Sequence, residues 1–62
     1  MNNKIKAYRK EQGMSQQALS EKVKVSRQTI NAIENNKYDP TLTLAFNLAN
    51  VLKTSVDDLF SH

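Results

Sequence analysis

The segment 16–35, QQALSEKVKVSRQTINAIEN, constrains the fold of this 62-residue chain more than any other stretch. Its larger apolar residues are Leu19, Val23, Val25, Ile30 and Ile33. Their spacing is helical on either side of an interruption at residues 24–25. One amphipathic helix needs no such break, whereas two helices that cross steeply do, because each must turn its apolar stripe toward the other. The segment therefore predicts short helices over residues 16–23 and 27–35, joined by a tight turn.

The second of these helices has an outward face rich in amides. At about 100° per residue, Ile30 and Ile33 point inward. The opposite side and its shoulder carry Gln28, Asn31, Ala32, Asn35 and Arg27. Paired amide and guanidinium groups match the edges of adenine and guanine in the major groove of DNA. The alternative is an ordinary polar surface, but the place of this face on the second helix of a helix-turn-helix favours DNA.

Charge is unevenly distributed along the chain, although the net charge is only +3 at pH 7. Residues 1–37 hold eight basic and three acidic side chains, whereas residues 38–62 hold one basic and three acidic. A basic half that contains the helix pair suits a polyanion. An ordinary solubilising surface is the alternative, so charge alone is weak evidence.

Composition argues against several classes of function. The chain has no cysteine, and its single histidine is His62 at the end. We therefore expect no disulfide framework, no metal site and no cofactor. No apolar run approaches the roughly 20 residues that span a bilayer, and MNNKIKAYRK lacks the apolar core of a signal peptide. We expect a cytoplasmic protein with no membrane partner and no small-molecule effector.

The rest of the chain completes an all-α fold of five helices in one domain over residues 1–62. A first helix is predicted over residues 3–12, with Gly13 as its stop and with Ile5 and Tyr8 facing inward. Further helices are predicted over residues 42–52 and 56–60. Their N-caps, like those of the central pair, are hydroxyl residues: Ser15, Ser26, Thr41 and Ser55.

The predicted fourth helix is apolar on more than one side. One broad stripe holds Leu42, Ala45, Phe46, Ala49 and Leu52, and a second holds Leu44, Leu48 and Val51. A helix that is apolar all round must be covered all round, and in so small a domain one cover can be a second subunit. Leu44, Val51 and Phe60 are therefore candidates for a homodimer interface. The alternative is that all these side chains belong to the intramolecular core.

The segment MSQQALSEKVKVSRQTINAIENNKYDP resembles the Cro/repressor-type (XRE) helix-turn-helix family, and the resemblance extends from about Ile5 to Phe60. The matching motifs are Ser-Gln at the start of the second helix, Ser-Arg-Gln-Thr-Ile and Ile-Glu-Asn around the third, and the proline before the fourth. The resemblance implies a compact, lambda-repressor-like, five-helix DNA-binding domain that usually acts as a dimer on a two-fold operator. Ser20 and Lys24 depart from the usual Ala and Gly, and we expect Lys24 to adopt a positive φ.

The family resemblance and the helical wheel together assign roles on DNA. Arg27 and Gln28 are expected to read guanine and adenine, with Asn31 and Ala32 one turn further on and Ala32 limited to a thymine methyl. Arg27 can alternatively reach a phosphate. Expected phosphate contacts are Gln16, Gln17, Ser26, Asn35, Lys37 and Tyr38. For Tyr38 we slightly favour packing of its ring under the loop over donation from its hydroxyl.

The resemblance also implies a structural ion pair between Arg9 and Glu34. The helical wheel agrees, because Glu34 lies near the edge of the apolar stripe of its helix rather than on the outward face. Such a pair ties the first helix to the end of the third.

Three classes of function compete. The first is a sequence-specific transcriptional regulator of double-stranded DNA, most simply a repressor that binds a palindromic operator as a dimer. The second is a protein-interaction module, such as an antitoxin or antirepressor subunit. An enzyme is disfavoured, because the chain has no internal histidine, no cysteine and no glycine-rich phosphate loop.

Overall fold

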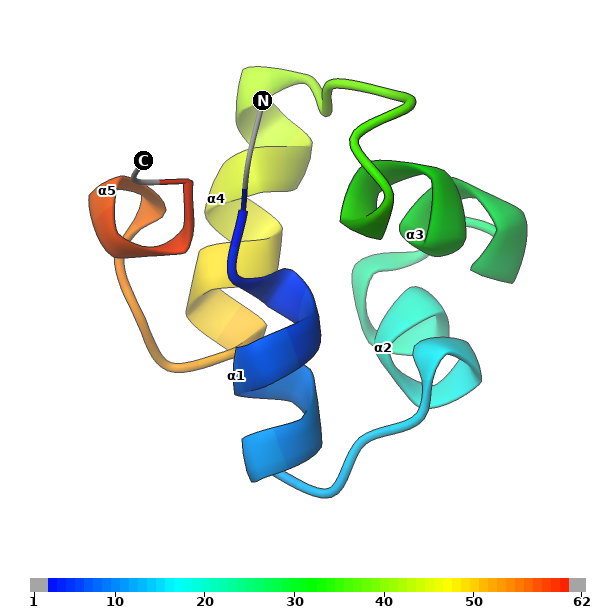
Figure 1. Cartoon of the computed structure of the whole chain (residues 1–62), viewed down its shortest axis with the longest axis horizontal. Coiled ribbons are helices and arrows are strands. Elements are labelled where there is room, and N and C mark those ends of the chain that lie inside the picture. The colour runs from blue at the N-terminus through cyan, green and yellow to red at the C-terminus, as the bar shows by residue number, and fades with distance from the viewer. Residues whose placement is uncertain (1–2, 61–62) are drawn as a thin grey trace.

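The computed structural model describes residues 3–60, which form five helices and no strand. The helices are α1 (Ile5–Glu11), α2 (Gln16–Val23), α3 (Arg27–Glu34), α4 (Leu42–Val51) and α5 (Val56–Leu59). Figure 1 shows α4 between α5 on one side and the α2–α3 pair on the other, with α1 in front. The all-α, five-helix prediction is confirmed, and α2 and α3 form the predicted helix-turn-helix.

The predicted hydroxyl caps are confirmed at four helices. Ser15, Ser26, Thr41 and Ser55 each accept a hydrogen bond from a backbone N–H of the first turn, at 3.0–3.2 Å. The predicted start of α1 is two residues too early, because the side-chain oxygen of Asn3 accepts from the N–H of Ile5 and the N–H of Lys4 donates to the carbonyl of Leu59. These bonds give residues 3–4 a capping role outside the helix.

Each of the first four helices is followed by a residue with left-handed backbone. These residues are Gly13, Lys24, Asn36 and Lys53, with φ between 58° and 69°. The positive φ predicted for Lys24 is confirmed: its φ is 62°, and its N–H donates to the carbonyl of Ser20. Left-handed backbone reverses the chain within a few residues and lets successive helices pack at steep angles.

All five helices contribute to one hydrophobic core. Its buried members are Ile5, Leu19, Val23, Ile30, Ile33, Leu48, Ala49, Leu52 and Leu59. Ser20 is also buried, and its hydroxyl donates to the carbonyl of Gln17 at 2.7 Å. A serine therefore fits where the family usually has alanine, because it is small and its polar group has a partner.

The outer surface of α4 differs from the predicted arrangement. Leu44 and Val51 are partly buried and pack against the core, as does Phe60 after α5. The exposed apolar side chains are Leu42 and Phe46, which are 68% and 58% accessible to solvent. From the broad stripe, only Ala45, Ala49 and Leu52 are buried. Leu42 and Phe46, at the edge of the stripe, remain exposed to solvent.

Neither membrane-spanning helices nor metal-binding clusters occur among the described residues. Within residues 3–60, no helix has the length and apolar character that a bilayer crossing requires. The same residues contain no cluster of three or more potential metal ligands. His62 lies outside the described residues.

Candidate nucleic-acid interface

The outward face of α3 is polar and accessible. Ile30 and Ile33 are almost fully buried, so they fix the rotation of the helix about its axis. On the opposite side Arg27, Gln28 and Asn31 are exposed, and Ala32 between them is partly exposed. No acidic residue of α3 lies on this side, because Glu34 is directed to the interior. The structure thus brings the four predicted base-reading residues onto one surface.

The turn after α3 brings a cation back beside this face. Asn36 has φ 60°, and the N–H of Lys37 donates to the carbonyl of Ala32 at 2.9 Å. This bond folds the chain over the last turn of the helix. As a result Lys37 lines two shallow depressions along α3, one with Arg27, Gln28, Asn31 and Ala32, the other with Ser26, Gln28, Thr29, Ala32 and Tyr38.

Tyr38 lies at the rim of the second depression. Its side chain is 49% exposed. The ring is therefore half in solvent rather than buried under the loop, which leaves the hydroxyl as its available polar group.

The two glutamines at the start of α2 have different surroundings. Gln16 is partly buried, and its Nε2 donates to Oε1 of Glu34 at 3.2 Å. Gln17 is exposed, and its Nε2 donates to Oε2 of Glu21 one turn along the same helix, at 2.8 Å. Gln16 is thus held by α3, whereas Gln17 is held only by its own helix.

Glu34 is the junction of three helices. Arg9 Nε lies 2.8 Å from Glu34 Oε2, and Arg9 Nη2 lies 3.2 Å from Glu34 Oε1. The side chains are 9% and 3% exposed respectively. Arg9 Nη1 donates in addition to the carbonyl of Met14. With the bond from Gln16, the carboxylate of Glu34 ties α1 and the start of α2 to the end of α3.

Sequence reasoning missed a second tie at this end of α3. Asn3 Nδ2 donates to the carbonyl of Ile33 at 2.8 Å and to Oδ1 of Asn36 at 3.3 Å. The amide therefore satisfies one of the carbonyls left unpaired at the helix end. An asparagine near the start of a helix gives no sequence signal for a partner 30 residues away.

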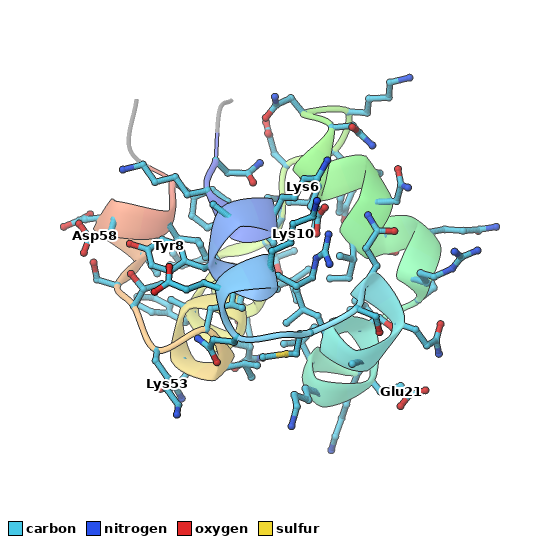
Figure 2. All side chains as sticks on the ribbon, turned by 60° about the horizontal axis from the view of Figure 1, so that its bottom comes forward. Lys6, Tyr8, Lys10, Glu21, Lys53 and Asp58 are labelled. Carbon is cyan, nitrogen blue, oxygen red and sulfur yellow. The ribbon has the colours of Figure 1, made fainter. Side chains whose placement is uncertain are left out.

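Two of the three acidic residues of the C-terminal half lie away from the α3 face. Asp57 and Asp58 are in the first turn of α5, where the helix dipole favours negative charge. Figure 2 places Asp58 at the α5 end of the molecule, on the opposite side from α3. These two carboxylates are therefore separated from the cations of the α3 face.

Comparison with known proteins identifies relatives along nearly the whole chain. A helix-turn-helix family model matches residues 5–59. An HTH-type transcriptional regulator of Methanocaldococcus jannaschii is 48% identical over 60 residues, which cover 97% of this chain and 91% of the relative. The HTH-type transcriptional regulator YgzD of Bacillus subtilis is 42% identical over 60 residues, with the same coverage.

Solved structures agree with the sequence relatives. SinR in complex with DNA, described as the master regulator for biofilm formation, matches with a TM-score of 0.77 and 38% identity over 84% of each chain. A complex of SinR and SinI matches with a TM-score of 0.86 and 36% identity, and there the match covers 94% of this chain and 57% of the other. The chain belongs to the XRE-type helix-turn-helix family, and it is a transcriptional regulator with a helix-turn-helix DNA-binding domain.

Proposed function

We propose that the protein is a repressor that binds a palindromic operator in double-stranded DNA, sequence-specifically and as a homodimer. The observation that carries this proposal is the outward face of α3, where Arg27, Gln28 and Asn31 are exposed together with Lys37 and without an acidic neighbour on the helix face. A helix of this kind fits the major groove, and its side chains match base edges there. The structural likeness to SinR bound to DNA supports the same placement.

In this proposal the side chains divide into two roles. Arg27 and Gln28 at the start of α3 read bases, and Asn31 and Ala32 follow one turn later. The N-terminus of α2 with Gln16 and Gln17, the cap Ser26, and the loop with Lys37 and Tyr38 contact phosphates on either side of the groove. Phosphate contacts set the register of the helix, and base contacts supply the sequence preference.

The dimer surface is proposed on α4 and α5, at a different place from that predicted by the sequence. Exposed Leu42 lines an apolar groove with Pro40, Ala45, Val56 and Phe60, and Phe46, which follows Ala45 in α4, is also exposed. Phe60 thus remains a candidate, while Leu42 and Phe46 replace Leu44 and Val51. A second copy packed there would bury Leu42 and Phe46, the two large apolar side chains with the greatest exposed fraction among the described residues. In the bound dimer the two recognition helices lie about 34 Å apart, one turn of B-DNA.

The deciding experiment is selection of bound duplexes from a random pool, read by sequencing. The proposal predicts one enriched motif with two inverted half-sites about one helical turn apart. A reporter promoter carrying this motif should be less active when the protein is expressed. Enrichment of a single unrepeated half-site contradicts the dimer, and increased reporter activity contradicts repression.

A protein-interaction module such as an antirepressor subunit is the second candidate. The exposed Leu42 and Phe46 favour it, and the relative SinR is found in a complex with SinI. This candidate predicts that no sequence is enriched from the random pool, at low as well as physiological salt.

A further inference from the structure

Two asparagines on the outward face of α3 are joined to each other. Asn35 Nδ2 donates to the backbone carbonyl of Asn31 at 2.9 Å and to the side-chain Oδ1 of Asn31 at 2.6 Å. Both residues are exposed. They lie one turn apart toward the C-terminal end of α3, the helix of the proposed DNA interface. The hydrogen bonds determine which end of each amide faces the other.

The orientation follows from what each group can donate or accept. A backbone carbonyl only accepts, so Asn35 must turn its NH2 group toward Asn31. That group lies within hydrogen-bond distance of both the backbone oxygen and the side-chain oxygen of Asn31. The side-chain atom of Asn31 that faces Asn35 is therefore the oxygen. The NH2 group of Asn31 is left pointing away from Asn35, toward solvent.

We propose that Asn35 is a positioning residue that makes Asn31 a hydrogen-bond donor toward the DNA, an inference that rests on the proposed function. An asparagine that pairs with adenine at both N6 and N7 needs a free acceptor and a free donor. In this chain the side-chain oxygen of Asn31 is turned toward Asn35, so the NH2 group is the part of its amide that faces a base. Asn31 therefore selects a base that offers acceptors in the major groove, which guanine does with both O6 and N7. It rejects cytosine, whose major-groove edge offers a donor.

This assignment changes the role of Asn35. A phosphate contact through its side chain requires the NH2 group, which in the free protein already donates to Asn31. In solvent the bond between two exposed amides is weak, because water competes for both partners. In a groove from which water is displaced that competition is removed, so the orientation is held when the base is read.

The test uses three variants of Asn35 and its neighbours. Asn35→Asp replaces the NH2 group with an acceptor, so Asn31 turns its own NH2 inward and presents its oxygen to the groove. Asn35→Ala removes the restraint and leaves Asn31 free to turn. Lys37→Ala is the matched control for charge, because it changes the net charge at the same end of α3 by the same unit as Asn35→Asp.

The measurement is the ratio of dissociation constants on four duplexes that differ at one base pair. That base pair is the one at which Asn31→Ala removes the preference of the wild-type protein. Wild type should prefer guanine over cytosine there by about five-fold, the size of one neutral hydrogen bond. Asn35→Asp should reverse the order toward adenine or cytosine, and Asn35→Ala should bring the four constants close together. Lys37→Ala should weaken all four equally.

Each other outcome counts against the inference. An Asn35→Asp variant that keeps the wild-type order of the four bases overturns it, provided that circular dichroism shows an unchanged helix content. An Asn35→Ala variant that loses affinity equally on every duplex and flattens the salt dependence shows a phosphate contact instead. If wild type selects no sequence, the proposed function fails together with this inference. If Asn35→Asp binds tightly and keeps the wild-type order of bases, the inference alone is overturned.

Discussion

At Lys24 the turn of the helix-turn-helix places a side chain on backbone that L-residues rarely adopt. Its φ and ψ are 62° and 41°, and the side chain is exposed. Left-handed backbone costs a non-glycine residue roughly 1–2 kcal/mol. The turn needs this geometry because the N–H groups of Lys24 and Val25 both donate to the carbonyl of Ser20 at the end of α2.

Lys24→Gly should therefore stabilise the protein. Relief of the strain exceeds the added entropy of the unfolded chain by about 0.5–1 kcal/mol. In a chain of this size the melting temperature should rise by about 2–8 °C. The matched control is Lys22→Gly, which removes the same charge from an exposed position inside α2 and should lower the melting temperature. Thermal melts followed by circular dichroism decide the matter, and a lower melting temperature for Lys24→Gly would contradict the strain.

Arg27 and Lys37 line the same depression on α3, but their expected roles differ. Arg27→Ala should cost about 1–3 kcal/mol on the best operator and relax the preference at one base pair. Lys37→Ala should weaken all duplexes about equally and reduce the salt slope by about one unit per subunit. Both variants are measured on matched and single-mismatch operators across a salt series. If Arg27→Ala retains every base preference and only flattens the salt dependence, Arg27 contacts the backbone.

Among the elements, those whose determinants are local were predictable from the sequence. The bounds of α2 were predicted without error and those of α3 within one residue, because a cap and an apolar period mark each of them. The start of α1 was not predictable, since it is set by bonds from residues 3–4 to α3 and α5. The rotation of α4 could not be predicted for a similar reason: a helix that is apolar on several sides carries no sequence signal for the side left uncovered.

In the candidate site, too, features with local determinants were predictable and features set by contacts between residues were not. The outward amides of α3 were predicted from the wheel, because Ile30 and Ile33 fix its rotation. The bonds that orient those amides were not predicted, since the pattern gives the face of a side chain and not its rotamer. The hydrogen bond that Gln16 donates to Glu34 depends on how α2 crosses α3, and the sequence pattern does not predict it.

Glu34→Ala should destabilise the protein more than it changes base preference. It leaves the largely buried guanidinium of Arg9 without its partner, a loss that typically costs about 3–5 kcal/mol. The melting temperature should fall sharply, while duplex selection below that temperature should return the same motif. Glu34→Gln, which retains one acceptor oxygen, should lose less. An unchanged melting temperature together with a new preferred motif would mean that Glu34 acts on the DNA.

The whole molecule has two sides of different chemical character. The α3 side carries exposed amides and cations, and the α4–α5 side carries the exposed apolar residues Leu42 and Phe46 together with Asp57 and Asp58. A basic side for DNA and an apolar side for a second copy can be occupied at the same time, which is the arrangement a two-fold operator requires.

Phe46→Asp should convert the dimer to a monomer. It replaces an exposed apolar side chain of the proposed contact with a charge. A single helix-turn-helix then binds the operator with the affinity of one half-site. The control is Asn50→Asp, one turn further along the same exposed side of α4, which adds the same charge without removing an apolar side chain. Sedimentation at micromolar concentration should show a dimer for wild type and Asn50→Asp only. A wild-type protein that stays monomeric, both free and on its best operator, would refute the dimer.

The ties that hold α1 join residues distant in sequence, and this has a consequence for local unfolding. The bonds made by Arg9, Asn3 and Gln12 reach across 25, 30 and 40 residues. Such contacts form only after long loops have closed, whereas α2 and α3 are neighbours along the chain. We expect α1 to detach from the rest of the domain as its own cooperative unit. Its amide protons then exchange with deuterium during these local openings. Each detachment frees Glu34 and with it Gln16, so bound operator should slow exchange in α1 as well as in α3.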